Sequence, residues 1–189
     1  MQADVVVREW ERNFGTVAPV GHLCRSVLQE RWMRIHSLPN SKRYASSPDE
    51  YDILLARQNA VATTLLGAGS ECIFFCCEFP GEPASRILDF LPAPLSEFVW
   101  LPELAALADD YEDIRVGATL VSWQPGQFDV LIRARADDEI GPVLFANMQK
   151  RTAFAPYDGG ADLFLDSPKV IPALKHQWAS WLSAHPDGV

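Results

Sequence analysis

The sequence predicts an α+β fold, in which a mostly antiparallel sheet packs against a long helix and against helices at both ends of the chain. Three observations lead to this prediction. A helix-starting signal at residues 47–50 precedes an apolar pattern with helical spacing that continues to residue 66. An apolar run of strand length, rich in Phe and Ile, follows at residues 71–79 and is expected to be central in the sheet. From residue 114 onward apolar and polar positions alternate, which predicts an antiparallel meander with one solvated face.

Length and composition predict a single globular domain over residues 1–189. With 48% hydrophobic and 22% charged residues, the chain is too apolar and too weakly charged for a disordered protein. Its first residues lack a basic region followed by a long apolar run, so we expect no secretory signal. Because no apolar stretch approaches the length of a membrane span, we expect a cytoplasmic protein that does not contact the membrane.

The N-terminal segment is predicted to be helical over residues 3–13, where valine, tryptophan and phenylalanine recur on one helical face. One or two further helical turns are predicted at residues 20–28. Residues 31–37 have the pattern of a strand. In that strand Met33 and Ile35 share one face, while Trp32, Arg34 and His36 share the other.

A polar, turn-rich loop is predicted at residues 38–47, and loops of this length often carry function. The loop ends in a strong helix start, in which Ser47 caps, Pro48 occupies the first helical position and Glu50 completes a capping box. The helix is predicted to end at Gly67.

The middle of the chain is predicted to be less regular. Residues 80–102 are rich in proline and are expected to be irregular, with a short strand at residues 86–90. A short helix is predicted at residues 101–110 and a strand at residues 114–123. Residues 124–127, Gln-Pro-Gly-Gln, have proline and glycine at the positions that a type II turn requires.

The last third of the chain is predicted to form the meander and a C-terminal helix. Strands are predicted at residues 128–136, 142–147, 151–155 and 161–165, the last of them after a turn at residues 158–160. In the first of these strands, Phe128, Val130, Ile132 and Ala134 are predicted to face inward. The helix is predicted to start at Pro168 or Pro172, with an apolar stripe of Val170, Leu174, Trp178, Trp181 and Leu182.

The cysteines predict buried, reduced thiols rather than a metal site. Three of the four lie in one apolar strand without a neighbouring histidine, and a repeated pair with metal-ligand spacing is missing. The four are Cys24, Cys72, Cys76 and Cys77. We therefore expect no metal and no cofactor.

A cationic segment stands out in a chain whose formal charge is −9. Between residues 31 and 48 there are several basic residues and no acidic one. The basic side chains are Arg31, Arg34, His36, Lys42 and Arg43. An anionic ligand, an acidic partner or the protein's own carboxylates must balance this charge.

The first candidate site lies within this segment. Arg34 and His36 project from the same face of the predicted strand, and the loop adds Ser41, Lys42, Arg43 and Tyr44. A guanidinium, an imidazole and hydroxyl groups could hold a phosphate or a carboxylate. The favoured alternative is that Arg34 and His36 pair with internal carboxylates and that the two loop cations are solvated.

The second candidate site is the sequence Tyr157-Asp158-Gly-Gly-Ala-Asp162. Its two carboxylates could bind a metal or act as a general base, although two are few for Mg²⁺ or Ca²⁺. A tight turn in which one aspartate caps the backbone is favoured. Our structural hypothesis joins the two sites: Arg34 or Arg43 pairs with Asp158 or Asp162 and thereby pins the loop onto the sheet without a ligand.

Two segments carry a resemblance to a known family. The sequence R-I-H-S-L-P-N-S-K-R-Y at residues 34–44 and Y-D-G-G-A-D at residues 157–162 resemble an uncharacterised bacterial family of small standalone proteins with a domain of unknown function. The resemblance implies no established activity. By loose analogy, small acidic bacterial proteins without catalytic motifs include immunity partners of toxins.

Three functions are therefore weighed. The first is a non-enzymatic protein-binding module, such as an immunity-type partner of a basic bacterial toxin or effector, which fits the acidic charge and the missing nucleophile motifs. The second is an enzyme or sensor for a small anionic ligand, phosphate or nucleotide-like, at the Arg34 and His36 face. The third is a structural or assembly protein, and the oligomeric state stays open. A pI near 4.8 argues against a nucleic-acid binder.

Overall fold

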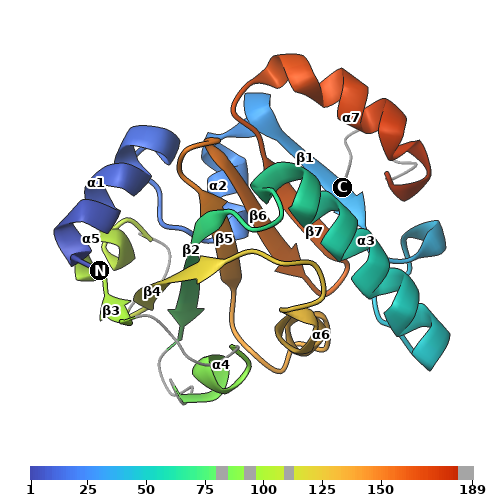
Figure 1. The fold of residues 1–189 in the computed structure, drawn as a ribbon, viewed down its shortest axis with the longest axis horizontal. Helices are drawn as coiled ribbons and strands as arrows, with labels where there is room; N and C mark the ends of the chain where they lie inside the picture. Colours follow the sequence, from blue (N-terminus) through green and yellow to red (C-terminus); the bar gives the residue numbers. More distant parts are fainter. Residues whose placement is uncertain (80–84, 92–96, 109–112, 183–189) are drawn as a thin grey trace.

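The computed structural model describes residues 1–79, 85–91, 97–108 and 113–182. In these residues a seven-stranded sheet separates two layers of helices (Figure 1). The strand order is β1-β7-β6-β5-β2-β4-β3, and all neighbouring strands are antiparallel. The predicted α+β fold with a mostly antiparallel sheet is confirmed.

The sheet is built around β2, and the two short strands β1 and β3 form its edges. The strands are β1 Trp32–His36, β2 Glu71–Glu78, β3 Val99–Trp100, β4 Arg115–Ser122, β5 Val143–Asn147, β6 Thr152–Tyr157 and β7 Gly160–Phe164. Strands β5, β6 and β7 follow one another as a meander, and β1 is added outside β7. This arrangement brings a segment near the start of the chain against one near its end.

The helices cover both faces of the sheet. One face packs against α3 Pro48–Leu66, α4 Ser85–Asp89, α6 Asp129–Ala136 and α7 Ile171–Gln177, and the other against α1 Ala3–Phe14, α2 Gly21–Val27 and α5 Pro102–Ala105. Short 3₁₀ turns are η1 Gln29–Arg31, η2 Pro39–Ser41, η3 Pro168–Val170 and η4 Ala179–Trp181. Among the described residues, no helix is both long enough and apolar enough to cross a membrane.

Burial on both faces corrects one expectation. The meander was predicted to have a solvated face, yet every residue of β5 and β7 is buried. In β2, Phe74 and Phe75 point into opposite cores and are both fully buried. A sheet sandwiched between helix layers needs apolar side chains on both faces, and the weak alternation of these strands already fits that requirement.

Helix α3 forms as its start signal predicts. The Ser47 hydroxyl accepts a hydrogen bond from the backbone N–H of Glu50, which satisfies one unpaired donor of the first turn. The predicted capping box is shifted by one residue, because the Glu50 carboxylate accepts from the N–H of Ser46. The buried Gln58 then donates to the Ser37 hydroxyl and to the Gly160 carbonyl, both at 2.8 Å. This amide fixes α3 over the end of the β1–β7 pair.

Two predicted strands are helices in the structure. Residues 128–136 were predicted as a strand, but α6 buries Leu131 and Ile132 together and leaves Val130 66% exposed. Leucine, alanine and arginine favour helix, and an eight-residue segment fits both periods until packing decides. The strand predicted at residues 86–90 is wrong for the same reason, since α4 occupies this segment.

Other elements agree with their predictions. Residues 124–127 form the predicted turn, with a hydrogen bond of 3.1 Å from the N–H of Gln127 to the carbonyl of Gln124 and a φ of 81° at Gly126. The C-terminal helix is divided into η3, α7 and η4, and Val170 of its predicted stripe is 40% exposed. Residues 80–84, 92–96 and 109–112, part of the predicted irregular segment and short helix, lie outside the described residues.

Candidate functional site

The two candidate sites meet at the β1 edge of the sheet. In the antiparallel register of β1 and β7, Arg34 lies opposite Asp162 and His36 lies opposite Gly160. The residues of the first pair are 128 positions apart in the sequence. Strand pairing alone therefore joins the cationic segment to the aspartate-containing turn, as our structural hypothesis predicted.

Arg34 forms an internal ion pair with Asp162. Its Nε donates to Asp162 Oδ1 at 3.1 Å, and the Trp32 indole N–H donates to the same oxygen at 2.9 Å. The guanidinium carbon lies 4.9 Å from the ring centroid of Tyr157 and 5.5 Å from that of Trp32. Because Asp162 is only 4% exposed, its charge would be costly without these donors.

Three consecutive loop residues, 42–44, each reach a carboxylate on a different element; we name them the loop clasp. Lys42 Nζ donates to both carboxylate oxygens of Glu50 on α3, at 2.6 and 2.7 Å. Arg43 Nε donates to Asp158 in the turn between β6 and β7. The Tyr44 hydroxyl donates to Asp138, just after α6, at 3.3 Å. The loop is thus attached to three elements at once.

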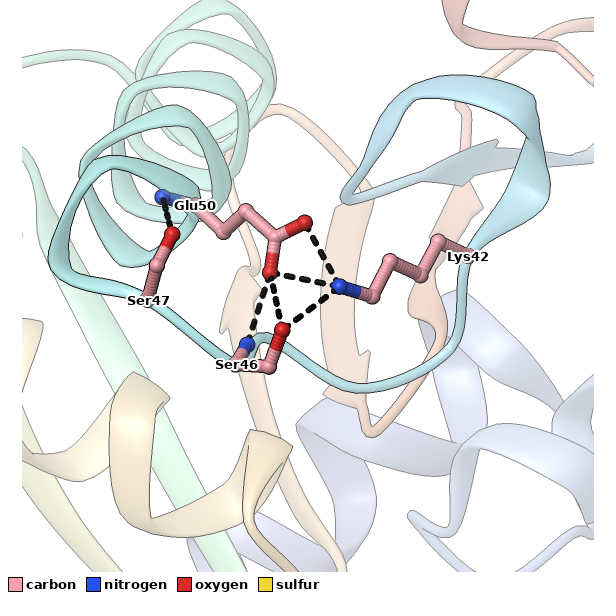
Figure 2. A network of polar contacts seen from close by, with 4 residues as sticks. All are labelled: Lys42, Ser46, Ser47 and Glu50. Atoms are coloured by element: carbon pink, nitrogen blue, oxygen red, sulfur yellow. Dashed lines mark hydrogen bonds and ion pairs between the residues drawn. The ribbon is translucent and has the colours of Figure 1, made fainter.

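The Glu50 end of the clasp is a compact polar network (Figure 2). One Glu50 oxygen accepts from the N–H of Ser46 at 2.7 Å and from its hydroxyl at 3.0 Å, besides Lys42. The hydrogen bond from Lys42, and then those from Ser46, lower the pKa of Glu50 to about 2. Glu50 therefore stays ionised and holds the loop against the first turn of α3.

Asp158 combines the two roles considered for it. One of its oxygens accepts from the N–H of Gly159 at 3.0 Å, which caps the turn, and the other accepts from Arg43. The glycine pair that follows has a steric cause at Gly160, where a Cβ would lie 2.0 Å from the carbonyl oxygen of Ile35. Close approach of β7 to β1 therefore requires glycine at this position.

His36 is held in its neutral form. Burial is the main cause that lowers its pKa, and the neighbouring positive charges of Arg34 and Arg57 lower it further. Arg57 also donates to the His36 carbonyl at 3.1 Å, and its guanidinium lies over the ring of Trp181. Among the described residues, His36 Nε2 is buried without a hydrogen-bond partner. Ser41 is exposed in η2, and no hydrogen bond to the described residues is found for its side chain.

Sequence reasoning did not foresee a second polar cluster, the acid–tyrosine face, which consists of Tyr44, Tyr51, Asp137 and Asp138. The Tyr51 hydroxyl donates to Asp137 at 2.7 Å, as that of Tyr44 does to Asp138. Arg133 lies over the Tyr51 ring at 3.9 Å. The face joins the start of α3, the loop clasp and the end of α6, so no local sequence pattern could reveal it.

The remaining charge of the protein is an excess of exposed carboxylates. Among the described residues, eight ion pairs join Lys or Arg side chains to Asp or Glu. Exposed carboxylates that take part in none of the ion pairs of the described chain include Glu11, Glu30, Asp49, Asp52, Glu71, Glu103, Glu139 and Asp166. The cationic segment is consumed internally, and the surface is left acidic.

The cysteines are free and buried, as predicted. Burial raises the pKa of the Cys24, Cys72 and Cys76 thiols to about 12, so they stay protonated and unreactive at neutral pH. No group of three or more His, Cys, Asp or Glu side chains within the described ranges is placed to hold a metal ion.

Comparison with known proteins agrees with the resemblance seen in the sequence. A family model described as a domain of unknown function, DUF3885, matches residues 20–186. The chain therefore belongs to this family, whose match includes β1, the loop clasp and the turn at Asp158. No curated protein and no solved structure gives a significant match to the chain.

Proposed function

We propose that the protein is a non-enzymatic binding module that holds a basic protein on its acidic surface. The acid–tyrosine face carries this proposal, because tyrosine hydroxyls already hold its carboxylates in place without a partner. Pre-ordered groups lose less conformational entropy on binding, and tyrosine combines a large contact area with few rotatable bonds. An acidic field would also steer a basic partner toward the protein.

Within this class, an immunity-type role fits best: the module would cover the cationic site of a bacterial toxin or effector. The support is charge complementarity, since the protein's cations are engaged internally while many carboxylates stay exposed. A cytoplasmic location, where thiols stay reduced, suits the four buried free cysteines.

A small anionic ligand at the Arg34 and His36 face receives less support. A phosphate or a nucleotide-like anion would compete with Asp162 for the Arg34 guanidinium, and the free nitrogen of His36 is buried. We therefore place the partner at the acid–tyrosine face.

Two charge-matched double variants test this proposal. Asp52→Asn with Asp138→Asn removes two carboxylates in and beside the face, whereas Glu11→Gln with Glu30→Gln removes two exposed carboxylates elsewhere. Each variant and the native protein are used to capture partners from native lysate at low salt. Affinity for the purified partner is then measured by calorimetry.

We expect the native protein and the Glu11/Glu30 variant to retain one basic protein in a one-to-one complex. The Asp52/Asp138 variant should bind it roughly tenfold more weakly, because two exposed ion pairs contribute about 0.5–1 kcal/mol each. Equal losses in both variants, an acidic partner, or a protein that only self-associates in sedimentation would refute the proposed function.

A further inference from the structure

An open hollow of about 650 Å³ lies at the other edge of the sheet, between α5 and the first residues of β4. It is larger than a second hollow of about 450 Å³ beside the β5–β6 turn. Its wall is mainly apolar and includes Leu101, Ala105, Ile114 and Val116. Pockets of 300–1,000 Å³ with apolar walls and a few polar groups are typical of small-molecule sites.

The hollow has a local cause in the sequence. Strand β3 is only two residues long, and after the N–H of Leu101 bonds to the Val116 carbonyl the chain leaves the sheet edge for α5. Helix α5 and the turn after it present alanines at positions 105, 106 and 108, which are too short to fill the space beside β4. Apolar surface of Ile114 and Val116 is therefore left open to a ligand.

One cation stands at this hollow. Arg115 lines it, and its guanidinium carbon lies 3.7 Å from the centroid of the half-exposed Trp100 ring. The side chain is 55% exposed, and its nearest nitrogen is 3.6 Å from Glu78, too far for a hydrogen bond. Stacking on Trp100 fixes the guanidinium in place while its donors can still accept an anion.

We propose that this hollow binds a small monocarboxylate with an apolar chain. The chain would lie against Leu101, Ala105 and Val116, and the carboxylate would accept hydrogen bonds from Arg115. This site lies on α5 and β4, apart from the acid–tyrosine face on α3 and α6, and does not depend on the proposed protein partner.

Titrations with three simple probes, followed by amide chemical shifts and calorimetry, test the ligand class. Octanoate carries both the chain and the anion, octylammonium carries the chain with the opposite charge, and acetate carries the anion alone. We expect octanoate to shift the amides of residues 100–108 and 113–116 and to bind at least about tenfold more tightly than either other probe. Equal binding of octanoate and octylammonium, or shifts centred elsewhere, would overturn the proposal.

Two matched pairs of variants test the location. Ala106→Glu places a negative charge on an exposed residue at the hollow, and its control is Ala56→Glu on an exposed position of α3. Ala105→Leu fills the hollow, and its control is Ala60→Leu. Both hollow variants should weaken octanoate binding about tenfold or more, while both controls should not change it. Unchanged affinity in Ala106→Glu, which is expected to fold normally, rules the site out even if Ala105→Leu does not fold.

Discussion

At the scale of single residues, the structure explains why the two sequence segments contain the residues they do. Tyr157, Asp158 and Asp162 serve the strand edge: the aromatic ring stacks on Arg34, one aspartate caps a turn and the other accepts two buried donors. Gly160 is required because the neighbouring strand leaves no room for a Cβ. These roles are structural and need no ligand.

Gly160→Ala should destabilise the protein strongly. The added Cβ would lie 2.0 Å from the Ile35 carbonyl oxygen, a backbone atom that can move only if β1 and β7 separate. We expect a loss of about 3 kcal/mol or more in the free energy of unfolding, measured with urea. Gly159→Ala is the matched control, because its Cβ would meet only the Tyr157 ring, at 3.1 Å. Equal losses in the two variants would show that crowding at Gly160 is not the cause.

His36 should make stability depend on pH. Its pKa is lowered in the folded state, so the unfolded chain binds the proton more tightly. The contribution of His36 is therefore zero at high pH, and stability falls as pH drops from about 6.5 toward the lowered pKa. We expect unfolding measured between pH 8 and pH 5 to show this loss and His36→Gln to remove it. A His36→Gln variant with the same pH dependence as the native protein would contradict this assignment.

At the scale of elements, the loop clasp attaches the segment between β1 and α3 to three other parts of the fold. Its ion pairs are exposed on the cationic side, and such pairs contribute little to global stability. They do restrict the loop, because three neighbouring side chains hold it from three directions. Local order, rather than overall stability, is therefore the property that depends on the clasp.

Arg43→Gln should loosen the loop without unfolding the protein. The variant loses the charge-assisted hydrogen bond to Asp158, so hydrogen exchange of amides in residues 38–47 should become faster while the melting temperature changes little. Lys175→Gln, on the exposed side of α7, is the control and should leave exchange in the loop unchanged. Unaltered exchange after Arg43→Gln would mean that the clasp does not order the loop.

Sequence reasoning predicted those elements whose signals are local. The α3 start depends on Ser47, Pro48 and Glu50, all within four positions, and it forms as predicted. Helix α6 was missed because apolar and polar residues alternate in a segment too short to separate strand from helix. The pairing of Arg34 with Asp162 could be proposed from charge alone, whereas Tyr44 with Asp138 could not, since only packing of α6 beside α3 brings them together.

At the scale of the whole molecule, the charges are sorted: cations are paired with carboxylates, and an excess of carboxylates faces solvent. The segment that first looked like an anion site instead connects the β1 edge to the end of the meander. The account depends on this internal neutralisation, because it leaves the acidic surface as the feature available to a partner.

The most direct test is a double-mutant cycle on Arg34 and Asp162, which lie 128 positions apart and join the two ends of the described sheet sequence. The free energy of unfolding is measured in urea for the native protein, Arg34→Gln, Asp162→Asn and the double variant. We predict a coupling energy of at least about 1 kcal/mol, because removing either partner leaves a buried group without its counter-charge. A coupling energy near zero would contradict internal neutralisation and would return Arg34 to the role of an anion-binding residue.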